Sequence, residues 1–159
     1  MYKVNVSGST PVLVLQTPFG TAGSNGEDLT PSHNGSSICY TTGSGQNNYD
    51  IAKFRTSDFA TLGSFYTGPY PQALAFSPDD LVVYASVHTA SGIKVFNASR
   101  FLSLGTISGP EVATKLTVDS TGRYLFAGYN ASFAMSREPL SSTPVDEALS
   151  RVLPRPELR

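Results

Sequence analysis

Short apolar segments separated by Gly, Pro, Asp, Ser and Asn form the main pattern of this chain. In the clearest stretch the apolar segments are 72–76, 82–87, 93–97 and 102–108. Segments of this kind, rich in β-branched and aromatic residues, are typical of β-strands, and the residues between them are those that tight turns use. Because the stretch has no apolar stripe at helical spacing, the pattern predicts an all-β fold.

A sequence repeat connects three parts of the chain. Residues 74–86 (LAFSPDDLVVYAS) and 116–128 (LTVDSTGRYLFAG) align without a gap at an offset of 42 residues, and residues 29–41 (LTPSHNGSSICYT) align with 74–86 at an offset of 45. Residues 51–65 match 93–107, again at an offset of 42. Four short strands in a unit of about 42 residues are typical of one blade of a β-propeller, whose four-stranded antiparallel sheets surround a central channel.

The repeat predicts two whole blades and two half blades. We expect a half blade in 1–26, whole blades in 27–68 and 69–110, and a half blade in 111–135. Closed propellers typically have four to eight blades, so the predicted ring is incomplete. Three explanations stay open: the chain is a piece or shortened relative of a longer propeller, it closes a ring with copies of itself, or it is an open arc capped by its tail. Unpaired blade edges at both ends favour self-association.

The tail, residues 136–159, differs in composition from the rest. It is rich in Pro and charged residues and has no aromatic residue. Val145, Leu149 and Val152 would share one face of a short helix, and such a helix could cover an open sheet edge. Because so short a helix is marginal without packing, a disordered tail is the alternative.

The best copy of the repeat resembles a known propeller repeat. It reads YPQALAFSPDD at 70–80, VYAS at 83–86 and IKVFN at 93–97. This pattern resembles the YVTN-type, WD40-like β-propeller repeat, and related blades occur in lactonase-type propellers. The resemblance covers residues 27–134 and implies a partial propeller of about three four-stranded blades. The chain has no Trp, so Phe96 and Asn97 stand where WD40 blades have their Trp-Asp pair.

Charge and composition exclude several classes of partner. The net charge is −1 and 14% of the residues are charged, which leaves no basic surface for nucleic acid or for an anionic membrane. No apolar run approaches the roughly 20 residues that span a bilayer, and the first residues lack the apolar core of a signal peptide. The localisation stays open. The single cysteine, Cys39, lies in an apolar segment, which predicts a buried side chain.

The sequence offers few candidates for catalysis. The two histidines, His33 and His88, fall in turns that emerge on opposite faces of a propeller, which disfavours a metal site made by both. Asp79 and Asp80 are explained by the turn that they form, and no nucleophile elbow occurs. We therefore expect no catalytic residue, no metal and no cofactor.

One face of the arc is the remaining candidate for function. This loop face is formed by the connections between second and third strands of a blade and by those between successive blades. Its candidate residues are Tyr49, Tyr70, Gln72, His88, Tyr129 and Asn130. Tyrosine rings beside amides and a histidine offer stacking and hydrogen bonds to a protein, a peptide or a glycan.

Two functions are compatible with these features. The first is a non-catalytic interaction or scaffold module that binds through the loop face. The second is a fragment of a propeller enzyme, such as a lactonase-type hydrolase, in which polar or metal-binding residues of several blades gather around the central channel. The channel ends of the first strands have Leu, Ala, Thr and Phe here, so we favour the first.

Overall fold

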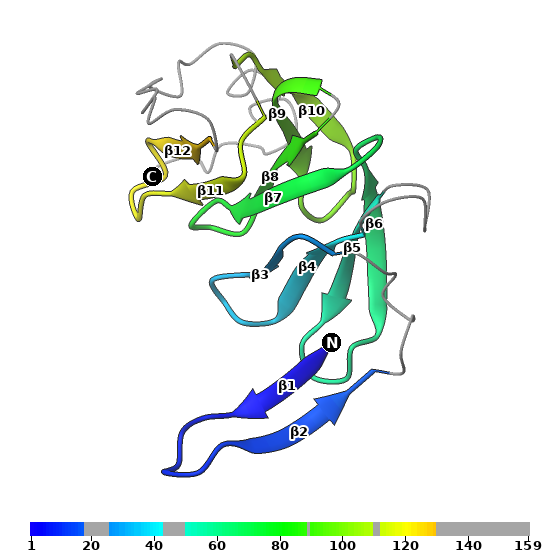
Figure 1. Cartoon of the computed structure of the whole chain (residues 1–159), viewed down its shortest axis with the longest axis vertical. Coiled ribbons are helices and arrows are strands. Elements are labelled where there is room, and N and C mark those ends of the chain that lie inside the picture. Colours follow the sequence, from blue (N-terminus) through cyan, green and yellow to red (C-terminus); the bar gives the residue numbers. More distant parts are fainter. Residues whose placement is uncertain (18–25, 43–49, 89, 110–111, 130–159) are drawn as a thin grey trace, which may run out of the picture.

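The computed structural model describes residues 1–17, 26–42, 50–88, 90–109 and 112–129, and the regular elements in these residues are β-strands (Figure 1). In chain order they are β1 (Tyr2–Asn5), β2 (Val12–Gln16), β3 (Leu29–Pro31), β4 (Ser37–Thr41), β5 (Asp50–Arg55), β6 (Thr61–Tyr66), β7 (Pro71–Phe76), β8 (Val82–Val87), β9 (Ala90–Asn97), β10 (Ser103–Ile107), β11 (Lys115–Val118) and β12 (Leu125–Gly128). The predicted segment 82–87 coincides with β8. The helix predicted in the tail, 136–159, lies outside the described residues.

Hydrogen bonding arranges these strands in four antiparallel sheets. β3 to β6 form one four-stranded sheet and β7 to β10 another, each in chain order, and we call each of them a blade. β1–β2 and β11–β12 are two-stranded, and we call each a half blade. Figure 1 shows the four sheets following one another along an arc, with β1–β2 at its lower end. The prediction of an all-β fold with two whole and two half blades is confirmed.

The strand register is the same at the aligned positions of the three repeats. The aligned positions pair as Leu29 with Tyr40, Leu74 with Ala85, and Leu116 with Ala127. A register shift also recurs between the third and fourth strands, after Lys53 in the first blade and at Gly105 in the second. The repeat seen in the sequence is therefore a repeat of backbone geometry, in which aligned residues have aligned partners.

One polar side chain closes the first turn of each unit. Ser77 Oγ accepts a hydrogen bond from the N–H of Val82 at 2.9 Å and donates one to Asp79 at 2.6 Å. The aligned residues Ser32 and Asp119 accept the corresponding N–H bonds in the first blade and the last half blade. Because these bonds lie within the turn, the local sequence alone can fix the reversal.

The apolar core lies between neighbouring sheets. One cluster joins the two blades, where the ring of Phe65 packs at 5.4 Å from Phe96 and at 5.0 Å from Phe101, measured between ring centroids. A second cluster joins the other side of the second blade to the last half blade and includes Tyr84 and Leu125. Every residue of β8 is buried as a result, which explains its unbroken run of apolar and small residues.

The first strands of successive blades, β3, β7 and β11, are the inner strands of the arc, and polar contacts hold them together as well. β3 and β11 both lie against β7. The Asp28 carboxylate accepts a hydrogen bond from the N–H of Leu74 through Oδ2 at 2.8 Å, and one from the N–H of Leu29 through Oδ1 at 2.9 Å. On the other side, Ser86 Oγ donates to the carbonyl oxygen of Ala113. These bonds fix each inner strand relative to the next.

Candidate functional site

Tyr70 and His88 lie in contact on the loop face. Tyr70 directly precedes β7 and His88 directly follows β8, and Pro71 and Val87 between them are paired across the two strands. The N–H of His88 donates a hydrogen bond to the carbonyl oxygen of Tyr70 at 2.8 Å. Their rings meet edge to face with 6.3 Å between centroids. The structure therefore brings together two of the residues predicted for this face.

The backbone of Tyr70 has a rare conformation. Its φ is +60°, in the left-handed region that bulky side chains seldom adopt. Its neighbour Pro71 is fully buried at the start of β7, while the side chain of Tyr70 is 41% exposed. The connection between the blades therefore holds a tyrosine ring at the surface at a cost in backbone strain, a feature that is enriched at binding sites.

The other predicted residues of this face are less exposed or lie outside the described part of the chain. Gln72 is half-buried on β7, beside the register shift between Pro71 and Leu74. Tyr129 is half-buried after β12, and its hydroxyl oxygen would lie 3.4 Å from a Cβ added at Gly109, so it packs near the segment that follows β10. Tyr49 and Asn130 lie outside the described residues.

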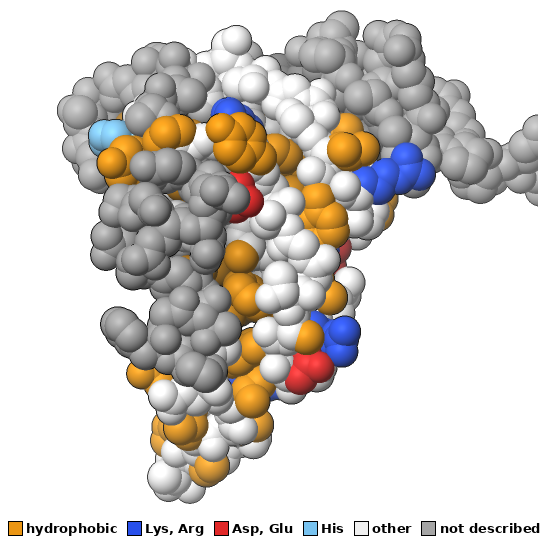
Figure 2. All heavy atoms as spheres, turned by 90° about the vertical axis from the view of Figure 1, so that its right-hand side faces the viewer, with side chains coloured by type: hydrophobic (Ala, Val, Ile, Leu, Met, Phe, Trp, Pro, Cys, Tyr) orange, Lys and Arg blue, Asp and Glu red, His pale blue; other side chains and the backbone are white. Residues whose placement is uncertain are grey.

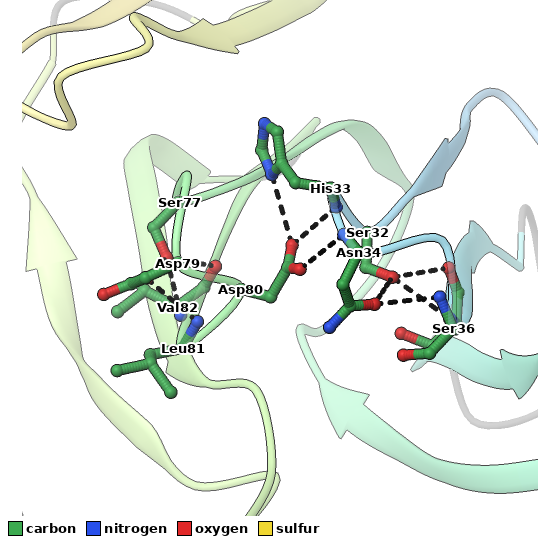
Figure 3. A network of polar contacts seen from close by, with 10 residues as sticks. Ser32, His33, Asn34, Ser36, Ser77, Asp79, Asp80, Leu81 and Val82 are labelled. Carbon is green, nitrogen blue, oxygen red and sulfur yellow. Dashed lines mark hydrogen bonds and ion pairs between the residues drawn. The ribbon is translucent and has the colours of Figure 1, made fainter.

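A second polar cluster lies on the opposite face, between the first turns of the two blades (Figure 3). The carboxylate of Asp80 accepts hydrogen bonds from the N–H of His33 at 2.7 Å and from the N–H of Asn34 at 2.9 Å. His33 Nδ1 lies 3.1 Å from Asp80 Oδ1. We call these contacts the Asp80 clamp. One side chain of the second blade thus holds the first turn of the preceding blade.

The conformation and charge of Asp80 both suit this clamp. Its φ is +60°, and the aligned residues Gly35 and Gly122 have φ of +69° and +71°. Asp tolerates this left-handed region better than most residues, so it can replace the glycine and add a carboxylate. Burial raises the pKa of Asp80, but the hydrogen bonds from Asn34 and His33 outweigh it, and its pKa is lowered from the ordinary value. The carboxylate is therefore ionised at neutral pH.

Asp50 is a third acidic residue with an unusual environment, at the loop-face end of β5. Its Oδ2 accepts a hydrogen bond from Ser64 Oγ at 2.9 Å, and its Oδ1 is buried without a hydrogen-bond partner among the described residues. Burial raises the pKa of Asp50, and the Ser64 bond opposes the rise. The charged form is therefore disfavoured here, in contrast to Asp80.

Sequence reasoning missed the roles of Asp28 and Asp80 across the blades. Asp80 carried one usable signal, because it replaces a glycine that stands at the aligned positions 35 and 122. Asp28 carried none, since its acceptor role depends on the neighbouring strand β7. The residues that the structure describes contain no group of three or more His, Cys, Asp or Glu placed to hold a metal ion. In the same residues no helix is long and apolar enough to cross a membrane.

Comparison with known proteins gives structural neighbours only. No protein-family description matches the chain, and no curated protein matches it. Among solved structures it is similar to Kuenenia stuttgartiensis hydrazine synthase, with a TM-score of 0.60 and 15% identity, over 74% of this chain and 33% of that one. It is also similar to the WD40 repeats of RRP9, with a TM-score of 0.56 and 16% identity, over 64% of this chain and 32% of that one. It is similar to the structure of U3-55K as well, with a TM-score of 0.56 and 15% identity, over 64% of this chain and 32% of that one.

These similarities establish the fold. The chain is a partial β-propeller with WD40-like blades, and it spans about a third of the length of the structures that it resembles. At 15–16% identity the neighbours do not transfer their activities to this chain. The finer assignment to the YVTN-type repeat stays a prediction.

Proposed function

We propose that the chain is a non-catalytic interaction module that binds a protein or a peptide through the loop face. The observation that supports this proposal is the exposed ring of Tyr70, whose left-handed backbone accepts a hydrogen bond from the N–H of His88. A tyrosine side chain has only two side-chain torsions, so it loses little conformational entropy on binding, and it combines apolar area with a hydroxyl group. Tyrosines of this kind are common at the centres of protein interfaces.

The contact between Tyr70 and His88 adds a polar partner beside the apolar one. The edge-to-face arrangement leaves an imidazole next to the tyrosine ring, and the side chain of His88 is exposed. A peptide that packs an apolar side chain on Tyr70 would find the His88 ring nitrogens within reach of its backbone groups. We therefore expect these two residues to contribute most of the binding energy on this face, with Gln72 and Tyr129 at its edge.

Selection of peptides from a displayed library on the immobilised chain, followed by calorimetric titration of the selected peptides, tests this proposal. We expect Tyr70→Asn to weaken binding by about 30-fold, the loss typical of an interface hot spot. Asn removes the ring and tolerates the left-handed backbone better than Ala does. His88→Ala should also weaken binding.

The matched control is Tyr124→Ala. Tyr124 is 46% exposed, close to the value for Tyr70, but it follows the first turn of the last half blade and lies on the opposite face. Equal losses for Tyr70→Asn and Tyr124→Ala would contradict the proposal. A parallel glycan array is the second arm: selected ligands that are glycans alone, with no peptide bound, would also overturn it.

A further inference from the structure

The hairpin β1–β2 has the geometry of the third and fourth strands of a blade. Its register shifts after Lys3, as the register of β5–β6 shifts after Lys53. The turn after β1 also repeats that of the second blade, because Asn5 Oδ1 accepts hydrogen bonds from Ser7 just as Asn97 Oδ1 does from Ser99. β1 therefore corresponds to β5 and β9, with Lys3 at the position of Lys53.

This half blade leaves its apolar side chains in solvent. Its exposed side chains, with their exposed fractions, are Tyr2 (70%), Val4 (45%), Val6 (73%), Val12 (58%), Leu13 (54%) and Val14 (56%). Figure 2 shows apolar side chains gathered at the lower end of the molecule, where this hairpin lies. Val4 corresponds to Phe54 and Phe96, which are 3% and 2% exposed in the complete blades. Val4 thus stands at a position that is buried in a complete blade, and it is exposed here.

The half blade at the other end supplies the complementary part. β11–β12 has the register of the first and second strands of a blade, with Leu125 at the position of Ile38 in β4 and Val83 in β8. In a blade the second strand pairs with the third, but among the described residues β12 pairs with β11 alone. One end of the chain therefore offers strands one and two, and the other offers strands three and four.

We propose that β12 of one copy of this chain pairs with β1 of a second copy, so that the two half blades form one complete blade. The register follows from the whole blades, in which Phe54 lies opposite Ile38 and Phe96 lies opposite Val83. By the same alignment, Val4 lies opposite Leu125 of the second copy. Lys3 then lies opposite Phe126, and Tyr2 opposite Ala127. This pairing would hydrogen-bond the open edge of β12 and bury Val4.

The described residues of two copies joined through both pairs of half blades contain six blades, counting two whole blades from each copy and two composite ones. Six lies within the range of four to eight blades that closed propellers typically have. A head-to-tail contact that closes on itself gives a discrete assembly, and it leaves neither β1 nor β12 with an open edge. A second copy is the occupant that the observations favour, because the complementary halves with matching registers belong to one and the same chain.

The mass of the purified chain in solution, by light scattering after size exclusion, is the first test. We expect a β-rich dimer of twice 16.9 kDa. Val4→Glu should weaken the dimer at least tenfold, because it places a charge in the composite blade. The control is Leu62→Glu on β6, since Leu62 is 40% exposed on a strand that already belongs to a complete blade. A monomer at tens of micromolar, or equal effects of the two variants, would refute the pairing.

Cross-linking tests the register. Residues directly opposite each other in an antiparallel pair have Cα atoms about 4.5–5.5 Å apart, within the range that disulfides span. The variant with Lys3→Cys and Phe126→Cys should form a covalent dimer on mild oxidation, whereas Lys3→Cys with Ala127→Cys, one residue out of register, should react much more slowly. Cys39 will not compete, because it is buried and burial raises its pKa to about 12. Equal rates for the two pairs would contradict the proposed register.

Discussion

Removing the Asp80 clamp should reveal how much one polar contact between blades contributes to stability. Asp80 accepts three hydrogen bonds from the preceding blade, two from backbone N–H groups of His33 and Asn34 and one involving the His33 ring. Asp80→Gly is the cleanest perturbation, because glycine occupies the aligned positions 35 and 122 at nearly the same φ. The change deletes the carboxylate and leaves the backbone of the turn unstrained.

The stability that the clamp contributes depends on how far its hydrogen bonds are exposed to water. Hydrogen bonds to charged groups contribute about 1.5–3 kcal/mol when they are well protected. The side chain of Asp80 is 11% exposed but that of His33 is 51% exposed, so water can replace part of what is lost. We therefore expect the clamp to contribute about 1–2 kcal/mol to the free energy of unfolding. Asp80→Gly should lose less than this, because glycine also relieves the strain of the left-handed backbone. Asp80→Ala keeps the strain and should be less stable than Asp80→Gly by about 1 kcal/mol.

Urea unfolding followed by circular dichroism measures these differences, and Asp80→Asn completes the series. Asn keeps one acceptor oxygen and tolerates the backbone conformation, so Asp80→Asn should lower the free energy of unfolding less than Asp80→Gly does. The pH dependence has a defined sign: the folded-state pKa of Asp80 is lowered, so the clamp contributes fully above the unfolded pKa and is lost as the pH falls through the folded pKa. A glycine variant as stable as the parent protein at pH 7 would refute the reasoning.

Two further predictions concern packing and burial. Gly63→Ala should lower the free energy of unfolding by about 1–3 kcal/mol, because its Cβ would lie 2.5 Å from the ring of Phe101. A Cβ at the aligned Gly105 would have nothing within 4 Å, so Gly105→Ala should lower it less. Equal shifts of the two variants in thermal unfolding would contradict this. Asp50→Asn should raise the Tm by about 1–2 °C at pH 7. The reason is that burial raises the pKa of Asp50, which penalises the folded protein above that pKa and not below the unfolded pKa. The gain should shrink toward pH 3, and a gain that grows on acidification would exclude this explanation.

The blades could be predicted from the sequence because their determinants are local. The offset of 42 residues between Leu74 and Leu116 reappears in the pairing of the strands, since Leu74 lies opposite Ala85 and Leu116 lies opposite Ala127. Ser77 and Asp79 close their turn by bonds to residues a few positions away, so the turn residues in the sequence already contain the geometry. The half blades were predicted for the same reason, since each is a hairpin with short-range pairing.

The contacts between blades could not be predicted in the same way. Asp28 and Asp80 each bond to residues about 45 positions away in the chain, and nothing in a single sequence identifies such partners. The contact between Tyr70 and His88 was predicted only as a shared face. Its edge-to-face geometry depends on the left-handed backbone of Tyr70, a conformation that propensity disfavours for tyrosine in that position.

The antiparallel order of the strands places the Asp80 clamp and the proposed binding residue Tyr70 on different faces of the arc. The connections between strands one and two, and between strands three and four, emerge together, and there the Asp80 clamp and the turn of Asn97 fix the backbone by short hydrogen bonds. The remaining connections emerge on the loop face, where Tyr70 is exposed. A substitution on the first face should therefore change the free energy of unfolding and leave binding intact. Tyr70→Asn should weaken binding without lowering the free energy of unfolding, because Asn tolerates the left-handed backbone better than Tyr does. The proposed function is then separable from the stability of the propeller.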